Sequence, residues 1–306
     1  MDIYLPIAEV AVNAPLIVLL GAVVGFISGM FGIGGGFLMT PMLVFLGVPA
    51  PVAVSSMANH VAASSMSSVI AYSRRRAVDL RMGAVLAAGG VVGAFAGVEL
   101  FRWLRLLGQA DLVVSVSYLL FLGVIGGLML LESLGAILRR RRNEPPKPRR
   151  DRRPVWLYGL PLKMRFPRSR LYISVIPPLG LGAFVGVLSA IMGVGGGFIL
   201  VPAMVYVLRM PAGMVVGTSL LQIIITTALT GVLQAGRNQT VDIVLATLLL
   251  VGGIVGAQFG ARASSRFRAE ELRAILALIV LLVGLRMGIG LFLTPDEPFV
   301  LMSGAG

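Results

Sequence analysis

Long apolar runs separated by short polar connections dominate the hydrophobic pattern of the chain. Most of these runs are long enough, as helices, to cross roughly 30 Å of hydrocarbon, and none alternates with the period of two typical of a transmembrane β-strand. The pattern predicts ten membrane segments, at about residues 15–31, 36–48, 52–73, 82–101, 112–138, 173–192, 197–208, 212–235, 243–261 and 272–293. The second segment of each half is short for a full crossing, so it is either half of a broken helix or the return leg of a hairpin.

A motif with three consecutive glycines occurs twice, and a constant spacing of 161 residues separates the copies. Residues 25–41 read GFISGMFGIGGGFLMTP, and residues 186–202 read GVLSAIMGVGGGFILVP. Each glycine in a helix costs about 1 kcal/mol relative to alanine, and a helix break in a membrane is tolerated only where it is buried in protein or lines a polar cavity. The glycines either allow close helix packing or belong to a binding site, and their duplication favours the binding site.

Composition places the chain among membrane proteins. Of its 306 residues, 57% are hydrophobic and 13% are charged, and its mean hydropathy is +0.94. The chain contains no cysteine, so disulfides and thiolate chemistry are excluded. Its single histidine and scattered carboxylates give no obvious zinc site, and no nucleophile is clustered with a base. We therefore expect no cofactor and no enzymatic activity.

Half of the basic residues lie in one stretch, because 13 of the 26 Lys and Arg fall between Arg139 and Arg170. This stretch contains six prolines, which excludes a membrane helix. It predicts a basic cytoplasmic linker lying against anionic headgroups of membrane lipids, rather than a nucleic-acid-binding segment. The predicted domains are a first membrane repeat at 1–138, this linker at 139–171 and a second membrane repeat at 172–306.

The same charges predict an orientation in the cell membrane. If the N-terminus lies outside and each segment changes side, 22 of the 26 cations fall on cytoplasmic connections and three on outer ones, as the positive-inside rule expects. Both termini then lie outside. Five segments in each half make the halves an inverted repeat, the arrangement of many secondary transporters. The predicted fold is an all-α polytopic membrane protein with about ten segments, some of them broken or re-entrant.

Further motifs recur at matching places in the two halves: SSMANH at 55–60 and GTSLLQ at 217–222, Val-Asp pairs at 78–79 and 241–242, and GGVVGAFAG at 89–97 and GGIVGAQFG at 252–260. The last pair predicts close helix packing through small residues. Together with the doubled glycine motif and the basic central loop, these motifs resemble the TauE/SafE sulfite exporter family, also called the toluenesulfonate uptake permease family. The resemblance covers nearly the whole chain apart from the linker. It implies a membrane carrier for sulfur-containing anions such as sulfite, sulfoacetate or other organosulfonates.

A small anion in a membrane interior needs compensating positive potential, and two glycine-rich helix starts can supply it. A helix start has free backbone N–H groups and carries about half a positive charge. Polar side chains of the third segments can add hydrogen bonds. The candidate substrate-binding residues are Gly34, Gly35, Gly36, Ser55, Ser56, Asn59 and His60 in the first half, and Gly195, Gly196, Gly197, Thr218, Ser219 and Gln222 in the second.

His60 stands where the second half has Gln222. Histidine is the side chain best suited to carry a proton near neutral pH, so His60 suggests that transport is coupled to protons or another ion. The alternative for His60, Asn59 and Gln222 is hydrogen bonding between helices.

Other functions share these sequence features. The chain is alternatively a transporter or channel for another small organic anion, or a structural membrane protein that transports nothing. Flux that does not saturate indicates a channel, and failure of every small anion to change the thermal stability indicates a structural role.

Overall fold

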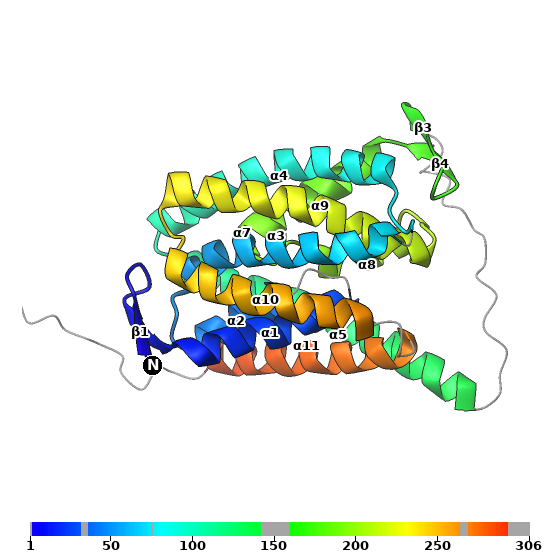
Figure 1. Cartoon of the computed structure of the whole chain (residues 1–306). Coiled ribbons are helices and arrows are strands. Elements are labelled where there is room, and N and C mark those ends of the chain that lie inside the picture. The colour runs from blue at the N-terminus through cyan, green and yellow to red at the C-terminus, as the bar shows by residue number, and fades with distance from the viewer. Residues whose placement is uncertain (1, 32–35, 75, 142–159, 264–268, 293–306) are drawn as a thin grey trace, which may run out of the picture.

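The computed structural model describes residues 2–31, 36–74, 76–141, 160–263 and 269–292. Within these residues the α-helices run roughly along one direction, and a short β-hairpin lies at each end of the bundle (Figure 1). The helices are α1 (Ala14–Phe31), α2 (Gly36–Phe45), α3 (Ala50–Arg74), α4 (Leu80–Leu106), α5 (Ala110–Arg141), α7 (Ile176–Met192), α8 (Gly197–Tyr206), α9 (Ala212–Leu233), α10 (Ile243–Ala263) and α11 (Ala269–Phe292). A π-helical turn, η1 (Gln234–Asn238), directly extends α9.

Each predicted membrane segment coincides with one of these helices, and most bounds differ by only a few residues. Among the described residues, five helices are long and apolar enough to cross a membrane, at 14–31, 80–106, 110–135, 213–238 and 243–263. α3 has 25 residues but is not among these five, because its serines, asparagine and histidine lower its hydropathy. The chain is therefore a helical membrane protein, and the crossing of all ten segments stays a prediction.

Two β-hairpins depart from the all-α prediction. They consist of β1 (Asp2–Leu5) with β2 (Val10–Asn13), and of β3 (Lys163–Phe166) with β4 (Leu171–Ser174). Each hairpin precedes the first helix of its half, with the same spacing of 161 residues as the glycine motif. β3 and β4 begin within the predicted linker at 139–171, and α5 reaches Arg141. Residues 142–159 of that linker lie outside the described residues.

Helices from the two halves pack against each other in matching pairs. α1 lies along α10, α4 lies along α7, α5 pairs with α11, and α3 pairs with α9. Glycine allows the closest of these contacts. A Cβ on Gly93 of α4 would collide with the carbonyl oxygen of Ala183, and a Cβ on Gly256 of α10 would collide with that of Ala22. The close packing predicted for the two matching glycine motifs is thus confirmed.

Each half contains one buried aspartate that bonds to the hairpin of the other half. Oδ1 of Asp79 accepts from two N–H groups in the first turn of α4, and Oδ2 accepts from the N–H and hydroxyl of Ser169 in the β3–β4 turn, at 3.0 and 2.6 Å. Asp242 repeats this at the other end. Its Oδ1 accepts from two N–H groups of α10, and its Oδ2 accepts from the N–H of Ile7 in the β1–β2 turn. Each aspartate caps a helix and fixes a hairpin at once.

Candidate functional site

The chain breaks at the second triple glycine, as the sequence predicts. Between α7 and α8, Gly193, Gly195 and Gly196 have φ angles of 71°, 73° and 71°, in the left-handed region that favours glycine. Gly196 then caps α8, whose first residue is Gly197. In the first copy, Gly34 and Gly35 lie outside the described residues, and Gly36 is the first residue of α2.

The two glycine motifs meet inside the bundle, although 161 residues separate them in the sequence. A Cβ on Gly36 would lie 2.8 Å from the carbonyl oxygen of Gly193 and 2.9 Å from the Cα of Val194. The following residues, Phe37 and Phe198, place their ring centroids 5.9 Å apart. The starts of α2 and α8 therefore lie next to each other.

The paired helices α3 and α9 line this meeting point. A Cβ on Gly195 would lie 2.7 Å from Val61 Cγ1 of α3, and 3.0 and 3.1 Å from Ile223 Cγ2 and Thr227 Cγ2 of α9. Val61 and Ile223 hold matching positions in the two halves, and both are fully buried. A side chain at Gly195 would displace one of these neighbours, so glycine is required here by space as well as by backbone conformation.

Two hydroxyl groups hold the end of α7 immediately before the break. The carbonyl oxygen of Met192 accepts from Tyr118 Oη at 2.7 Å and from Thr40 Oγ1 at 3.4 Å. Both side chains are fully buried. The sequence prediction missed them, although a tyrosine within the apolar run of α5 was the available signal. They fix the position of the break relative to α2 and α5.

Two further serines lie in the last turns of α1 and α7, before the two triple glycines. Ser28 of α1 and Ser189 of α7 are 161 residues apart, and both are buried. The Oγ atom of each has no hydrogen-bond partner among the described residues. A buried polar group without a partner costs about 1–3 kcal/mol, so these positions favour a polar occupant. The constant spacing of the repeat was the sequence signal for this pair.

The predicted hydroxyl ligands at the start of α3 and α9 bond to other protein groups. Ser55 Oγ lies 2.6 Å from Thr240 Oγ1, and Ser56 Oγ accepts from the N–H of Asp242 at 3.0 Å. Thr218 Oγ1 accepts from the N–H of Asp79 at 3.0 Å, and Ser219 Oγ donates to a carbonyl of its own helix. Three of these four hydroxyls thus hold the segments that precede α4 and α10, and their contact with a substrate stays a prediction.

His60 and Gln222 contact matching glycines in opposite halves. The His60 imidazole occupies the space where Gly253 of α10 would carry a side chain, and Gln222 Nε2 would lie 2.9 Å from a Cβ on Gly90 of α4. Both residues are fully buried. Both ring nitrogens of His60 and Oε1 of Gln222 have no partner among the described residues. Proton coupling through His60 stays a prediction.

Asn59 is the half-buried member of the predicted set. Its amide group lies against Gly231 of α9, where a Cβ would collide with it. This contact joins the two paired helices α3 and α9, and both the hydrogen-bonding alternative and the polar lining stay predictions for Asn59.

Comparison with known proteins gives a consistent result. A probable membrane transporter protein of Xylella fastidiosa is 30% identical over 269 residues, which cover 87% of this chain and 91% of the relative. The probable membrane transporter protein YjnA of Bacillus subtilis is 26% identical over 89% of this chain and 98% of its own. A shorter match, 28% identical, covers 39% of this chain and 26% of an Arabidopsis thaliana protein named sulfite exporter TauE/SafE family protein 3. No solved structure matches the chain significantly.

The family comparison covers most of the chain. The profile described as Sulfite exporter TauE/SafE matches residues 17–287, which include both glycine motifs and every helix from α2 to α10. The chain therefore belongs to the sulfite exporter TauE/SafE family.

Proposed function

We propose that this protein is a secondary-type transporter of small sulfur-containing anions, such as sulfite, sulfoacetate or another organosulfonate. The anion binds where the two glycine motifs meet. The observation that supports this most is the contact between the starts of α2 and α8, where Gly36 approaches Gly193 and Phe37 approaches Phe198.

The physical basis is the positive potential of helix starts. The first N–H groups of a helix have no partner within it, and the start carries about half a positive charge. Two such starts at one place favour an anion there without a buried basic side chain. Among the described residues, the buried charged side chains are Asp79 and Asp242, and both are engaged as helix caps. Binding without a fixed counter-charge suits a site that must also release its ligand.

A sulfite or sulfonate group fits the donors available. It presents three oxygens, so it can accept from the N–H groups of both helix starts, and we propose the open hydroxyls of Ser28 and Ser189 as further donors. The family name and the printed name of the Arabidopsis relative, sulfite exporter, support sulfite as the first substrate to test.

The same proposal includes an inverted repeat in the cell membrane. Two observations support repeats that share one fold and enter the membrane from opposite sides. These are the matching pairs of helices and the reciprocal bonds of Asp79 and Asp242. The positive-inside rule then puts the β3–β4 end and the basic linker in the cytoplasm and the β1–β2 end outside.

Single cysteines test this orientation, since the natural chain has none. Tyr4 in β1 and Leu162 next to β3 are 61% and 71% exposed. We expect a membrane-impermeant maleimide to label Tyr4→Cys in intact cells, and to label Leu162→Cys only after the membrane is permeabilised. The cysteine-free parent is the control. If only Leu162→Cys is labelled from outside, the orientation is the opposite of the one proposed. If Tyr4→Cys and Leu162→Cys are both labelled from the same side, the inverted repeat is ruled out.

Flux measurements test the substrate. Purified protein in sealed vesicles is expected to move sulfite with saturating kinetics, and organosulfonates are expected to compete. A short carboxylate serves as the comparison anion. Flux that rises linearly with sulfite concentration would indicate a channel. Transport of the carboxylate without transport of sulfite would show that the substrate is an anion of another class.

A further inference from the structure

We infer that a second anion site lies at the β1–β2 end, in a pocket of about 600 Å³ lined by Arg102, Arg105, Leu106, Arg237 and Asn238. This arginine pocket binds a small oxyanion at the β1–β2 end of a route that connects with the glycine motifs. The inference deepens the proposed function and rests on it.

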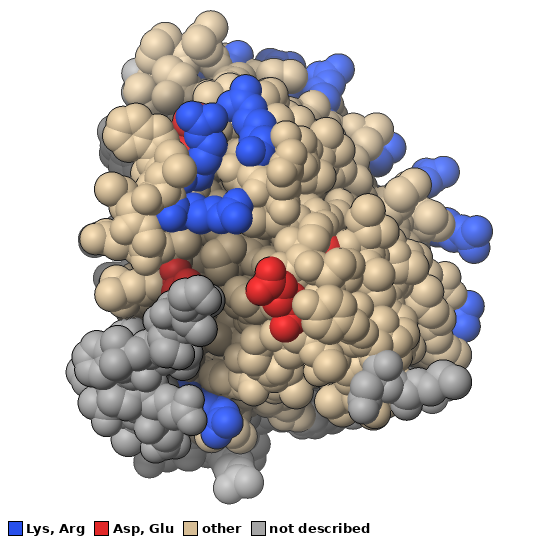
Figure 2. Space-filling model, turned by 90° about the vertical axis from the view of Figure 1, so that its left-hand side faces the viewer, with Lys and Arg blue, Asp and Glu red and all other residues tan. Residues whose placement is uncertain are grey.

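The charge of the arginine pocket favours an anion. Glu99 Oε1 lies 3.1 Å from Arg102, and Glu99 Oε2 lies 3.0 Å from Arg237. One carboxylate thus pairs with two of the three guanidinium groups, which leaves an excess of two positive charges in the pocket. Figure 2 shows basic side chains gathered over one part of this face, beside an acidic group and a hollow. Guanidinium groups match the oxygens of sulfite, sulfonate or phosphate.

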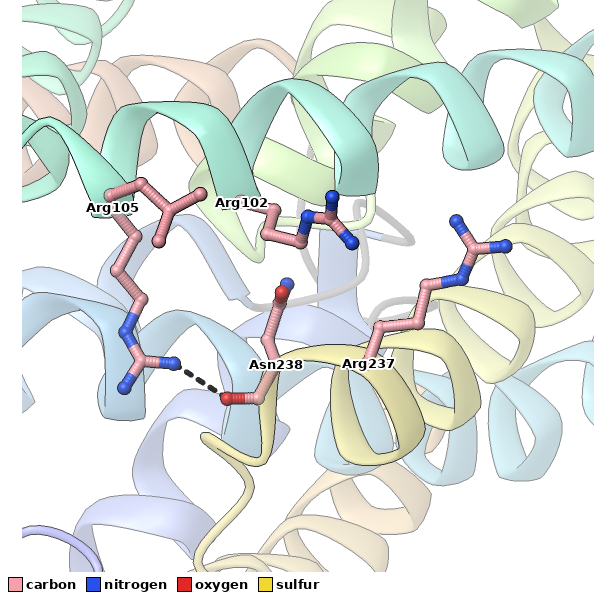
Figure 3. A pocket seen from close by; sticks show the side chains of 5 residues that line it. Arg102, Arg105, Arg237 and Asn238 are labelled. Carbon is pink, nitrogen blue, oxygen red and sulfur yellow. Dashed lines mark hydrogen bonds between the residues drawn. The ribbon is translucent and has the colours of Figure 1, made fainter.

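Asn238 forms the floor of the arginine pocket. Arg105 donates to its carbonyl oxygen at 2.5 Å, and Figure 3 shows the three guanidinium groups around it. The Asn238 side chain is 5% exposed and donates to Oε1 of Gln234, yet its own Oδ1 has no partner among the described residues. Gln234 Nε2 donates to Ala190, which fixes the orientation of both amides. The open Oδ1 is an acceptor, as are the oxygens of an oxyanion, so its partner is a water molecule held between it and the anion.

A line of buried polar side chains leads inward from this floor. They stand four residues apart on α9 and η1, so that each is the neighbour of the next along the helix: Asn238, Gln234, Thr230, Thr226 and Gln222. All are at most 5% exposed. Thr230 Oγ1 and Gln222 Oε1 also have no partner among the described residues.

The polar line reaches the glycine break. Gln234 bonds the carbonyl of Ala190, three residues before Gly193, and Thr227, next to Thr226, adjoins Gly195. From Asn238 to Thr226 the distance along the helix is about 18 Å at 1.5 Å per residue. A π-helical turn such as η1 often marks a functional position. The arginine pocket therefore lies at the β1–β2 end of a polar route to the proposed binding site.

The matching face of α3 differs. Ser64 and Ser68, which correspond to Thr226 and Thr230, donate to carbonyls of their own helix, and Thr226 does the same. Thr230 Oγ1 has no partner among the described residues, so the difference between the two helices rests on Thr230 and on the amides of Gln234 and Asn238 beyond it.

Charge-removing variants test the arginine pocket in sealed vesicles of neutral lipid, with sulfite as the probe. Arg105→Gln and Arg237→Gln are expected to raise the KM for sulfite added at the β1–β2 end by about tenfold, the lower range of electrostatic effects on encounter, with little change in maximal rate. The difference from wild type should shrink at high salt, because salt screens exposed charges. Arg81→Gln, exposed at the opposite end of the same helix as Arg105, is the control.

Calorimetric titration of the detergent-solubilised protein with sulfite tests the pocket independently of transport. We expect both variants to lose one of two binding events and to keep the other. Unchanged KM and unchanged titrations in the two variants would overturn the arginine pocket while leaving the proposed function standing. An effect that appears only in vesicles with anionic lipid would overturn it too, in favour of a headgroup site. Absence of sulfite transport by the wild type, with the binding event still lost in the variants, would contradict the proposed function alone.

Discussion

Gly195→Ala is expected to abolish sulfite transport, or to reduce it by at least about tenfold, while the protein still folds. A φ angle of 73° at this position costs a residue with a side chain roughly 1–2 kcal/mol. The added Cβ would also lie 2.7 Å from Val61 and 3.0 Å from Ile223, so one of these core side chains must shift. Because the starts of α2 and α8 meet beside them, that shift alters the proposed anion site directly. Sulfite flux in sealed vesicles measures the effect.

Gly47→Ala is the matched control for this experiment. Gly47 has a φ angle of 84°, but nothing lies within 4 Å of the position of its Cβ. Both variants therefore carry the same kind of backbone strain, and only Gly195→Ala adds a side chain at the glycine break. Thermal unfolding in detergent verifies that both are folded. Equal transport by the two variants would reduce the second triple glycine to a turn with no role in binding.

Asp79→Ala is expected to cause the largest loss of stability among single substitutions outside the apolar core. It removes a helix cap, worth about 1 kcal/mol, and leaves the buried N–H and hydroxyl of Ser169 without their partner, at about 1–3 kcal/mol. Asp242→Ala should cost less, because its Oδ2 accepts from one group, the N–H of Ile7. The midpoint of thermal unfolding is the measurement.

Asp111→Ala serves as the comparison for the aspartates. Its Oδ1 accepts a single hydrogen bond, from the N–H of Ala50 at 3.2 Å, and its side chain is exposed. We expect a smaller fall in the unfolding midpoint for Asp111→Ala than for either of the two caps. If Asp79→Ala unfolds at the wild-type temperature, the joining of one half to the hairpin of the other contributes nothing to stability.

The helices were predictable from the sequence because each contains a long, mainly apolar run bounded by polar connections. The segment predicted at 36–48 is the helix Gly36–Phe45, and the one at 52–73 is Ala50–Arg74. The hairpins were not predictable in the same way. β3 and β4 lie in a basic stretch with proline, and the turn between them is fixed by Asp79, about 90 residues earlier in the chain. Such a contact has no local signal.

The proposed site was predictable only in part. The repeated glycines pointed to two breaks, but their contact through Gly36 and Gly193 depends on the way the halves pack. The hydroxyls of Ser55, Ser56 and Thr218 were read as ligands, whereas the residues that hold them lie in the opposite half of the chain. The spacing of four from Gln222 to Asn238 was visible in the sequence, but a helix that continues as far as Asn238 was needed to make each of these residues the neighbour of the next.

The position of a bound anion shows whether the two glycine motifs form the binding site. Selenite resembles sulfite, and its selenium can be located by anomalous X-ray scattering in crystals of the protein. We expect a selenium peak beside the starts of α2 and α8, and loss of that peak in Gly195→Ala. Selenium found elsewhere in the protein, with none at the meeting point of the glycine motifs, would contradict it.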